Sequence, residues 1–152
     1  SICISDRKSG GQIISKHSIV IDVFKTLGYI LHSHKIWVKG TGVNDYRVNY
    51  QHIMTFSRKG AKRKPVADFK PDVFIVNQSK YKNYTYGMPV RIIELLVNNY
   101  TDKDNIVYDP FMGSGTTAEA CENTRRRWIG SEIDKKYGEL VKERMGLSET
   151  EL

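Results

Sequence analysis

The chain has 152 residues, of which 39% are hydrophobic and 27% charged, and its formal net charge is +7. This size and composition suit one globular domain with a core and exclude an intrinsically disordered chain. No apolar run reaches the roughly 20 residues that a membrane-spanning helix needs. Two cysteines far apart, Cys3 and Cys121, exclude a disulfide framework and a cysteine-based zinc site. We expect a cytoplasmic protein without a signal peptide that does not contact a membrane.

The first segment, residues 1–57, is expected to form one half of an α/β domain. Alternating apolar residues over 1–6 predict a short strand, which the run Ser9-Gly10-Gly11 ends. A helix is predicted over Ile13–Leu27, with Gly28 as its left-handed cap. Its inner face would carry Ile14, His17, Ile21 and Phe24. Two strands rich in β-branched and aromatic residues are predicted over Tyr29–Val38 and Tyr50–Ser57.

The second segment, residues 58–87, is strongly basic. Between Arg58 and Lys82 there are eight basic and two acidic residues, which supply most of the net positive charge. With two prolines and little periodicity, the segment is predicted to be a long loop or a small inserted lobe. Such a segment favours a polyanionic partner, nucleic acid above all, although charge alone equally allows a solvated loop.

The third segment, residues 88–152, alternates helices and strands. The elements predicted in chain order are a helix (89–100), a strand (105–109), a helix (116–124), a strand (127–133) and a helix (134–145). Because consecutive strands separated by helices pair in parallel, this order predicts an α/β fold.

The most informative motif joins the strand ending at Asp109 to the helix beginning near Thr116. Gly113 and Gly115 allow a sharp backbone turn that a ligand can approach closely, and the helix amides favour a negative group. Glu132 lies 23 residues after Asp109. At about this spacing, doubly wound folds have a carboxylate that hydrogen-bonds the ribose hydroxyls of the ligand. A phosphate-binding P-loop is disfavoured because it requires a lysine after its last glycine. Two alternatives are not excluded. One is a dinucleotide site, with Ala118 in place of the third glycine, and the other is a turn that binds no ligand.

The sequence Asp109-Pro110-Phe111-Met112-Gly113-Ser114-Gly115-Thr116-Thr117, followed by Arg126–Asp134, resembles the S-adenosylmethionine-binding region of amino-directed DNA methyltransferases. These enzymes methylate adenine N6 or cytosine N4. Weaker similarities lie upstream, over 28–30, 36–40, 50–58 and 88–93, in the order of the family's β-type branch. The resemblance implies a three-layer α/β sandwich of the Rossmann-like methyltransferase type, in one domain, lacking its N-terminal strand or strands.

The resemblance also implies roles for residues. The residues implied to bind S-adenosyl-L-methionine are Met88, Pro89, Asp109, Pro110, Phe111, Gly113, Ser114, Gly115, Thr116, Thr117 and Glu132, with Glu132 on the ribose hydroxyls. Segment 58–87 would be the target-recognition region. The residues implied to contact double-stranded DNA and its flipped base are Tyr46, Tyr50, Lys59, Lys62, Arg63, Lys64, Lys80, Tyr81 and Lys82, with Tyr84 and Tyr86 as further candidates.

One element of the family pattern is missing. The catalytic tetrapeptide, in which two adjacent prolines precede an aromatic residue, has no counterpart, since none of the four prolines adjoins another. In the β-type order it would precede Ser1. This leaves a larger enzyme, a split enzyme with a partner subunit, or a degenerate remnant.

We therefore expect a restriction–modification type DNA methyltransferase, with adenine N6 favoured over cytosine N4, or its cofactor-binding and target-recognition portion. The alternatives are a catalytically inactive nucleic-acid-binding remnant or subunit, and a methyltransferase acting on RNA or a small molecule. No metal is expected, because His32 and His34, which share one face of a strand, have no evident third ligand.

Overall fold

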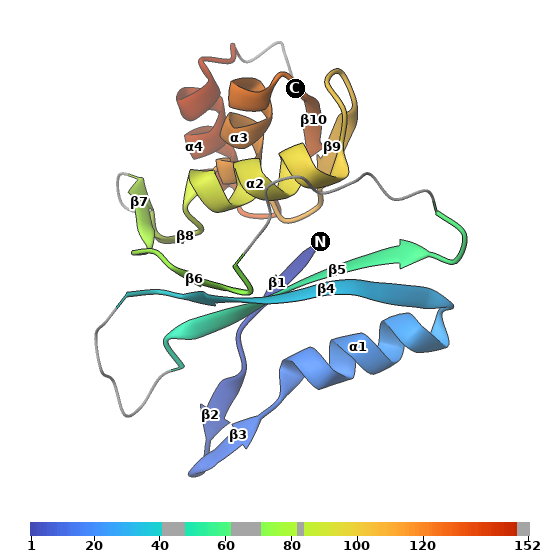
Figure 1. Ribbon diagram of the computed structural model, residues 1–152. Helices are drawn as coiled ribbons and strands as arrows, with labels where there is room; N and C mark the ends of the chain where they lie inside the picture. Colours follow the sequence, from blue (N-terminus) through green and yellow to red (C-terminus); the bar gives the residue numbers. More distant parts are fainter. Residues whose placement is uncertain (41–47, 62–70, 82–83, 149–152) are drawn as a thin grey trace. The chain divides into compact units, whose positions relative to one another are not determined.

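The computed structural model describes residues 1–40, 48–61, 71–81 and 84–148 (Figure 1). The chain divides into two compact units. Unit 1 comprises residues 1–63 and 70–77, and unit 2 comprises residues 64–69 and 78–152. No helix in the described part of the chain is long and apolar enough to cross a membrane.

Unit 1 is built on a four-stranded mixed sheet. Its strands, in spatial order, are β1 (Ile2–Ile4), β5 (Tyr50–Arg58), β4 (Tyr29–Val38) and β6 (Val73–Ile75). The β1–β5 and β5–β4 pairs are antiparallel, and β6 runs parallel to β4. The two long strands confirm the predictions for 29–38 and 50–57. A β-bulge between Leu31 and Ser33 shifts the β4–β5 register, so that Ile36 lies opposite His52.

Helix α1 (Lys16–Thr26) packs against this sheet through the apolar face that the sequence indicates. The Phe24 ring stacks on Phe56 at a centroid distance of 4.4 Å and meets Tyr29 edge-on. Gly28, with φ +81°, takes the left-handed conformation expected at the end of the helix.

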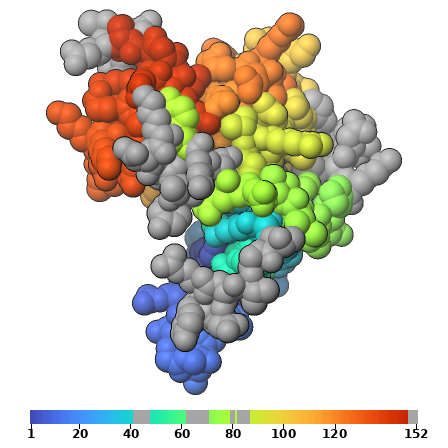
Figure 2. All heavy atoms as spheres, turned by 90° about the vertical axis from the view of Figure 1, so that its left-hand side faces the viewer, coloured from blue at the N-terminus to red at the C-terminus, as the bar shows by residue number. Residues whose placement is uncertain are grey.

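The start of α1 differs from the prediction. Residues Gln12–Ile14 form strand β3, which pairs with β2 (Arg7–Ser9) in an exposed antiparallel hairpin. Gly10 and Gly11 have φ of +57° and +76° and form its two-residue turn. Ile14, predicted on the inner face of the helix, is therefore an exposed strand residue. In Figure 2 the N-terminal elements are the blue atoms at the lower end of the view.

Asp6, between β1 and β2, anchors the first turn of α1. Its carboxylate accepts hydrogen bonds from the backbone N–H of His17 at 3.3 Å and from the His17 ring at 2.9 Å. Burial alone would raise the pKa of the Asp6 carboxyl. The hydrogen bonds from His17 and His52 outweigh that effect, so the pKa lies below its ordinary value.

The basic segment, predicted as a long loop or a small inserted lobe, contains short strands that were not predicted. Besides β6, it contains the antiparallel pair β7 (Ser79–Tyr81) and β8 (Tyr84–Gly87). The Trp37 indole donates to the carbonyl of Val76 at 2.7 Å, which fixes the chain just after β6. These strands escape a sequence analysis based on periodicity because they are only three or four residues long.

Unit 2 also contains α2 (Val90–Tyr100), β9 (Ile106–Asp109), α3 (Thr116–Thr124), β10 (Arg127–Gly130) and α4 (Lys135–Met145). Strands β9 and β10 are parallel, as predicted, and α3 packs against α2 and α4 (Figure 1). Strand β10 ends at Gly130, three residues before its predicted end. One core cluster of this unit comprises Met112, Ala118 and Val141, with Trp128 and Met145 packed against them.

Candidate functional site

The loop between β9 and α3 begins where two parallel strands end. Asp109, the last residue of β9, lies opposite Gly130, the last residue of β10. The backbone continues this pairing beyond the strands, because Ser131 N–H donates to the Asp109 carbonyl and Met112 N–H donates to the Ser131 carbonyl, both at 3.0 Å. The carboxyl ends of parallel strands are where open α/β sheets bind ligands.

Asp109 fixes the first turn of this loop. One of its carboxylate oxygens accepts the backbone N–H of Phe111 at 2.9 Å, and the other accepts the Thr117 hydroxyl at 2.5 Å. The first bond bends the chain away from β9, and the second ties the loop to the first turn of α3. The carboxylate is therefore held in one orientation at the strand end.

Glu132 connects the two loops that follow β9 and β10. Its Oε2 accepts the backbone N–H of Gly113 at 2.7 Å, and its Oε1 accepts the N–H of Asp134 at 2.9 Å. The side chain is half-buried. Each carboxylate oxygen can accept a further hydrogen bond, so the group can hold hydroxyl donors of a ligand while it keeps the loop in place.

The two glycines of the motif are needed for different reasons. Gly113 has φ +55° and Gly115 has φ +83°, conformations that residues with side chains rarely adopt. A Cβ on Gly115 would also lie 3.4 Å from both methyl groups of Val141 on α4. Glycine at position 115 thus allows the turn that begins α3 to pack closely against Val141 of α4.

Arg144 supports the loop from α4, a role that the sequence did not reveal. Its guanidinium donates to the Ser114 carbonyl at 3.0 Å and to the Glu119 carboxylate at 2.5 Å. The Tyr81 ring of β7 lies against the same group, 4.6 Å from Cζ to the ring centroid. No local motif marks Arg144, because its partners Ser114, Glu119 and Tyr81 lie 25 or more residues away along the chain.

The other implied cofactor residues differ in exposure. Phe111 is 86% exposed, and Pro110 beside it is also exposed. Ser114 and Thr116 are buried. Met88 is half-buried and Pro89 is buried; both precede α2.

The described candidates for DNA contact lie in both units. In unit 1, the half-buried Tyr50 ring meets His52 edge-on at 5.3 Å, and Lys59 is exposed just after β5. In unit 2, Tyr81 is the residue that packs on Arg144. For Lys80, Tyr84 and Tyr86 only the backbone is described. Tyr46, Lys62, Arg63, Lys64 and Lys82 lie outside the described residues.

The sequence and the structure were each compared with known proteins, and both comparisons match the same kind of protein. A family model described as DNA methylase (N6_N4_Mtase) matches residues 2–143. The type II methyltransferase M.MjaI of Methanocaldococcus jannaschii is 26% identical over 183 residues, covering 94% of this chain and 59% of that protein. The chain spans little more than half the length of such curated relatives.

Two solved structures superpose well. M1.HpyAVI in complex with SAM has a TM-score of 0.74 at 27% identity, covering 86% of this chain and 70% of that one. The cytosine-N4-specific PvuII DNA methyltransferase has a TM-score of 0.81 at 17% identity, covering 97% of this chain and 63% of that one. These superpositions confirm the predicted α/β fold of the methyltransferase type.

Proposed function

Because this chain belongs to the DNA methylase family of amino-directed methyltransferases, we propose that it forms the cofactor-binding and target-recognition portion of an S-adenosylmethionine-dependent DNA methyltransferase. The target is the exocyclic amine of adenine, with cytosine N4 as the alternative. The type II names of its relatives support a role in restriction–modification.

The arrangement of Asp109 and Glu132 carries the proposal. Both carboxylates stand at the carboxyl edge of the parallel pair β9–β10, each held by backbone amides of the same glycine loop. This donor set fits a nucleoside ligand, because a fixed carboxylate accepts the two hydroxyls of a ribose and glycines leave the backbone open to close approach. That M1.HpyAVI was solved with SAM supports the same assignment.

The residues of this chain would divide the work of binding. Glu132 holds the ribose hydroxyls, and Asp109 positions the loop through Phe111 and Thr117. The exposed Phe111 ring offers an apolar surface to the cofactor. S-adenosylmethionine, when bound, supplies an electrophilic methyl group on a sulfonium ion.

The tetrapeptide that holds the target amine is proposed to come from polypeptide outside these 152 residues. No two of the four prolines are adjacent, so the chain contains no double-proline tetrapeptide. We expect this chain alone to bind the cofactor without transferring its methyl group. Methyl transfer to DNA by this chain alone would contradict this part of the proposal.

Calorimetric titration with S-adenosylmethionine tests the cofactor site. Glu132→Gln and Asp109→Asn should each weaken binding at least tenfold, about 1.4 kcal/mol, since each replaces a fixed negative acceptor by an amide. Glu139→Gln is the matched control, because Glu139 is exposed on α4 and pairs only with Lys142 among the interactions described. A folded chain that does not bind, or equal affinities for all three variants, would refute the cofactor assignment.

Double-stranded DNA is the proposed partner of the basic segment 58–87. Fluorescence anisotropy with a labelled duplex should show binding that weakens as salt rises, because phosphate contacts release counterions. Lys59→Gln should weaken binding to all sequences alike and lower the salt slope by about one. Lys135→Gln on α4 in unit 2 is the control. Absence of duplex binding at low salt would remove the target-recognition assignment.

A further inference from the structure

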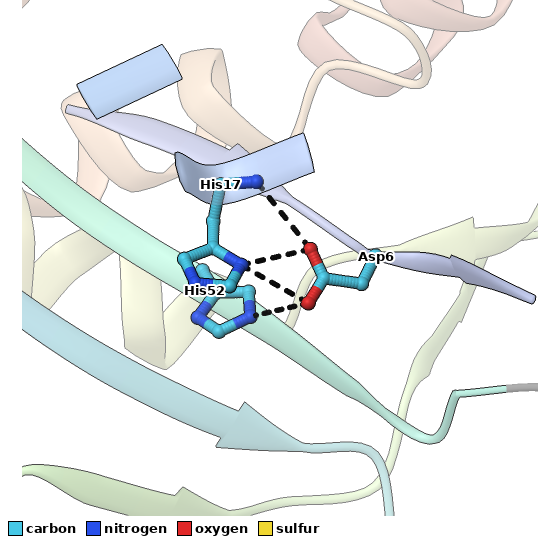
Figure 3. Close-up of side chains that lie close together, drawn as sticks. All are labelled: Asp6, His17 and His52. Carbon is cyan, nitrogen blue, oxygen red and sulfur yellow. Dashed lines mark hydrogen bonds and ion pairs between the residues drawn. The ribbon is translucent and has the colours of Figure 1, made fainter. Parts of the chain in front are cut away.

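Three side chains of unit 1 converge outside the proposed cofactor site. Asp6 follows β1, His17 lies in the first turn of α1 and His52 lies in β5, and one ligand atom from each falls within 4.8 Å of the others (Figure 3). The chain has four histidines, and two of them contribute to this cluster. None of the three residues takes part in the loop held by Asp109 and Glu132.

Both imidazoles point a nitrogen at the same carboxylate. His17 Nδ1 lies 2.9 and 3.0 Å from the two Asp6 oxygens, and His52 Nε2 lies 3.3 Å from Oδ2. The two rings are stacked, with centroids 3.8 Å apart and planes inclined by 24° (Figure 3). One carboxylate and two imidazoles, whose ligand atoms lie within 4.8 Å of one another, form a donor set typical of zinc and neighbouring transition metals.

Two members of the cluster are buried and the third is half-buried. The side chains of Asp6 and His52 are 3% and 8% exposed, whereas that of His17 is 24% exposed. A buried carboxylate is costly unless positive charge or several donors compensate it. Hydrogen bonds from His17 and His52 do so for Asp6 here, and a divalent ion bound by the same three groups would do so by its charge. Because His17 is partly exposed, we expect an ion to reach the cluster from its side and water to complete the coordination.

A third histidine supports the cluster from behind. His34 Nε2 lies 2.8 Å from His52 Nδ1, the ring nitrogen that does not face Asp6. Histidines that bind metals usually donate their second N–H to an acceptor that fixes the ring and its tautomer, and His34 Nε2 is placed to be that acceptor for His52. The two histidines of β4 have different partners: His34 contacts His52, whereas His32 contacts Ser57. The β-bulge between Leu31 and Ser33 lies at His32.

We propose that Asp6, His17 Nδ1 and His52 Nε2 bind one divalent transition-metal ion, zinc by preference, with His34 as the positioning residue of His52. Neutral imidazoles need only shift their protons to the opposite nitrogens to ligate, with His34 accepting from His52 Nδ1. The ion would join the β1–β2 segment, α1 and β5, three elements that otherwise meet only through packing and hydrogen bonds. Its role is to stabilise unit 1, and it is independent of cofactor binding.

Metal titration of the untagged, chelator-treated full chain tests the proposal. We expect uptake of one Zn²⁺ per chain at micromolar concentrations, with a rise in the unfolding temperature. Co²⁺ should give the visible absorption bands of a low-coordinate site with nitrogen and oxygen ligands, a readout that requires no variant. No saturable zinc uptake by the folded chain, or a Co²⁺ spectrum like that of the hydrated ion, would refute the metal site in favour of a hydrogen-bonded cluster.

Variants identify the ligands. His34→Gln should weaken zinc binding about tenfold, within the usual range for losing a partner that supports a ligand. His17→Gln removes a ligand and should weaken binding more, at least about a hundredfold. His32→Gln is the matched control on the same strand and should bind as the parent chain does. Equal zinc affinity in His17→Gln and His32→Gln, both shown to be folded by circular dichroism, would overturn the assignment even if zinc binds elsewhere.

Discussion

The guanidinium of Arg144 lies 4.6 Å from the centre of the Tyr81 ring. A residue of α4 thus packs on a residue of β7, which precedes it by 63 residues. The same guanidinium donates to the Ser114 carbonyl in the glycine loop. Arg144 therefore connects a tyrosine of the proposed target-recognition segment to the backbone of the proposed cofactor loop. Both contacts lie within unit 2.

Arg144→Ala should destabilise the chain by about 2–3 kcal/mol, since it removes charge-assisted hydrogen bonds and a cation–π contact. S-adenosylmethionine binding should weaken as well, because Ser114 loses its support. Urea unfolding and calorimetry measure the two effects. Lys142→Ala on the same helix is the control, and its surface pair with Glu139 should contribute less than about 1 kcal/mol. Equal effects of the two substitutions would show that Arg144 does not anchor the loop.

Two glycines of unit 2 should respond to alanine in opposite directions. Gly115→Ala should lower the free energy of unfolding by about 1–2 kcal/mol, because φ of +83° strains a residue with a Cβ. Gly138→Ala should raise it by about 0.5–1 kcal/mol, because a Cβ there meets nothing within 4 Å in α4 and alanine favours helix. Chemical denaturation of both variants checks the signs, and a stabilising Gly115→Ala would contradict the loop geometry.

Gly130→Ala should destabilise the chain by about 1–3 kcal/mol through overpacking. Its Cβ would overlap the terminal methyl of Met112, a buried residue of the unit 2 core. Shortening that side chain with Met112→Val should recover part of the loss in the double variant, so the two changes should be non-additive. Additive losses in denaturant unfolding would mean that the two side chains do not compete for the same space.

The two cysteines should differ sharply in reactivity. Cys121 is buried in α3, and burial raises the pKa of its thiol to about 11, so almost no thiolate forms at pH 8. Cys3 is exposed. A thiol reagent at pH 8 should modify one cysteine per native chain and two in denaturant, and Cys3→Ser should abolish the native reaction. Rapid modification of both thiols in the native chain would contradict the packing of α3.

Sequence alone predicted the helices and strands from α2 to α4 well, because apolar residues there recur at helical spacing and the loop is marked by Gly113 and Gly115. Helix α3 was placed correctly at both ends. The hairpin around Gly10 and Gly11 was mistaken for a simple break, although paired glycines also suit the turn of a two-residue hairpin. The strands at 73–87 were missed because elements of three or four residues give no periodic signal.

Contacts between distant residues were not accessible from sequence. His17 was assigned to the apolar face of a helix, and nothing local associates it with Asp6 or with His52, 35 residues further on. The position of His17 beside Asp6 and His52 depends on two features. The β2–β3 hairpin moves the start of α1 to Lys16, and the pairing of β1 with β5 brings Asp6 near His52. The glycine motif, by contrast, could be recognised because Asp109, Gly113 and Thr117 lie within a nine-residue stretch.

The pairing of β1 with β5 also bears on the order in which the chain folds. Ile2 pairs with Met54 across 52 residues, whereas Ile106 pairs with Arg127 across only 21. Closing the longer loop costs about 0.8 kcal/mol more chain entropy. The β9–α3–β10 segment should therefore gain protection against hydrogen exchange earlier during refolding than the β1–β5 pair. The two units would then reach their native pairing on different timescales, with the first strand of the chain among the last to be ordered.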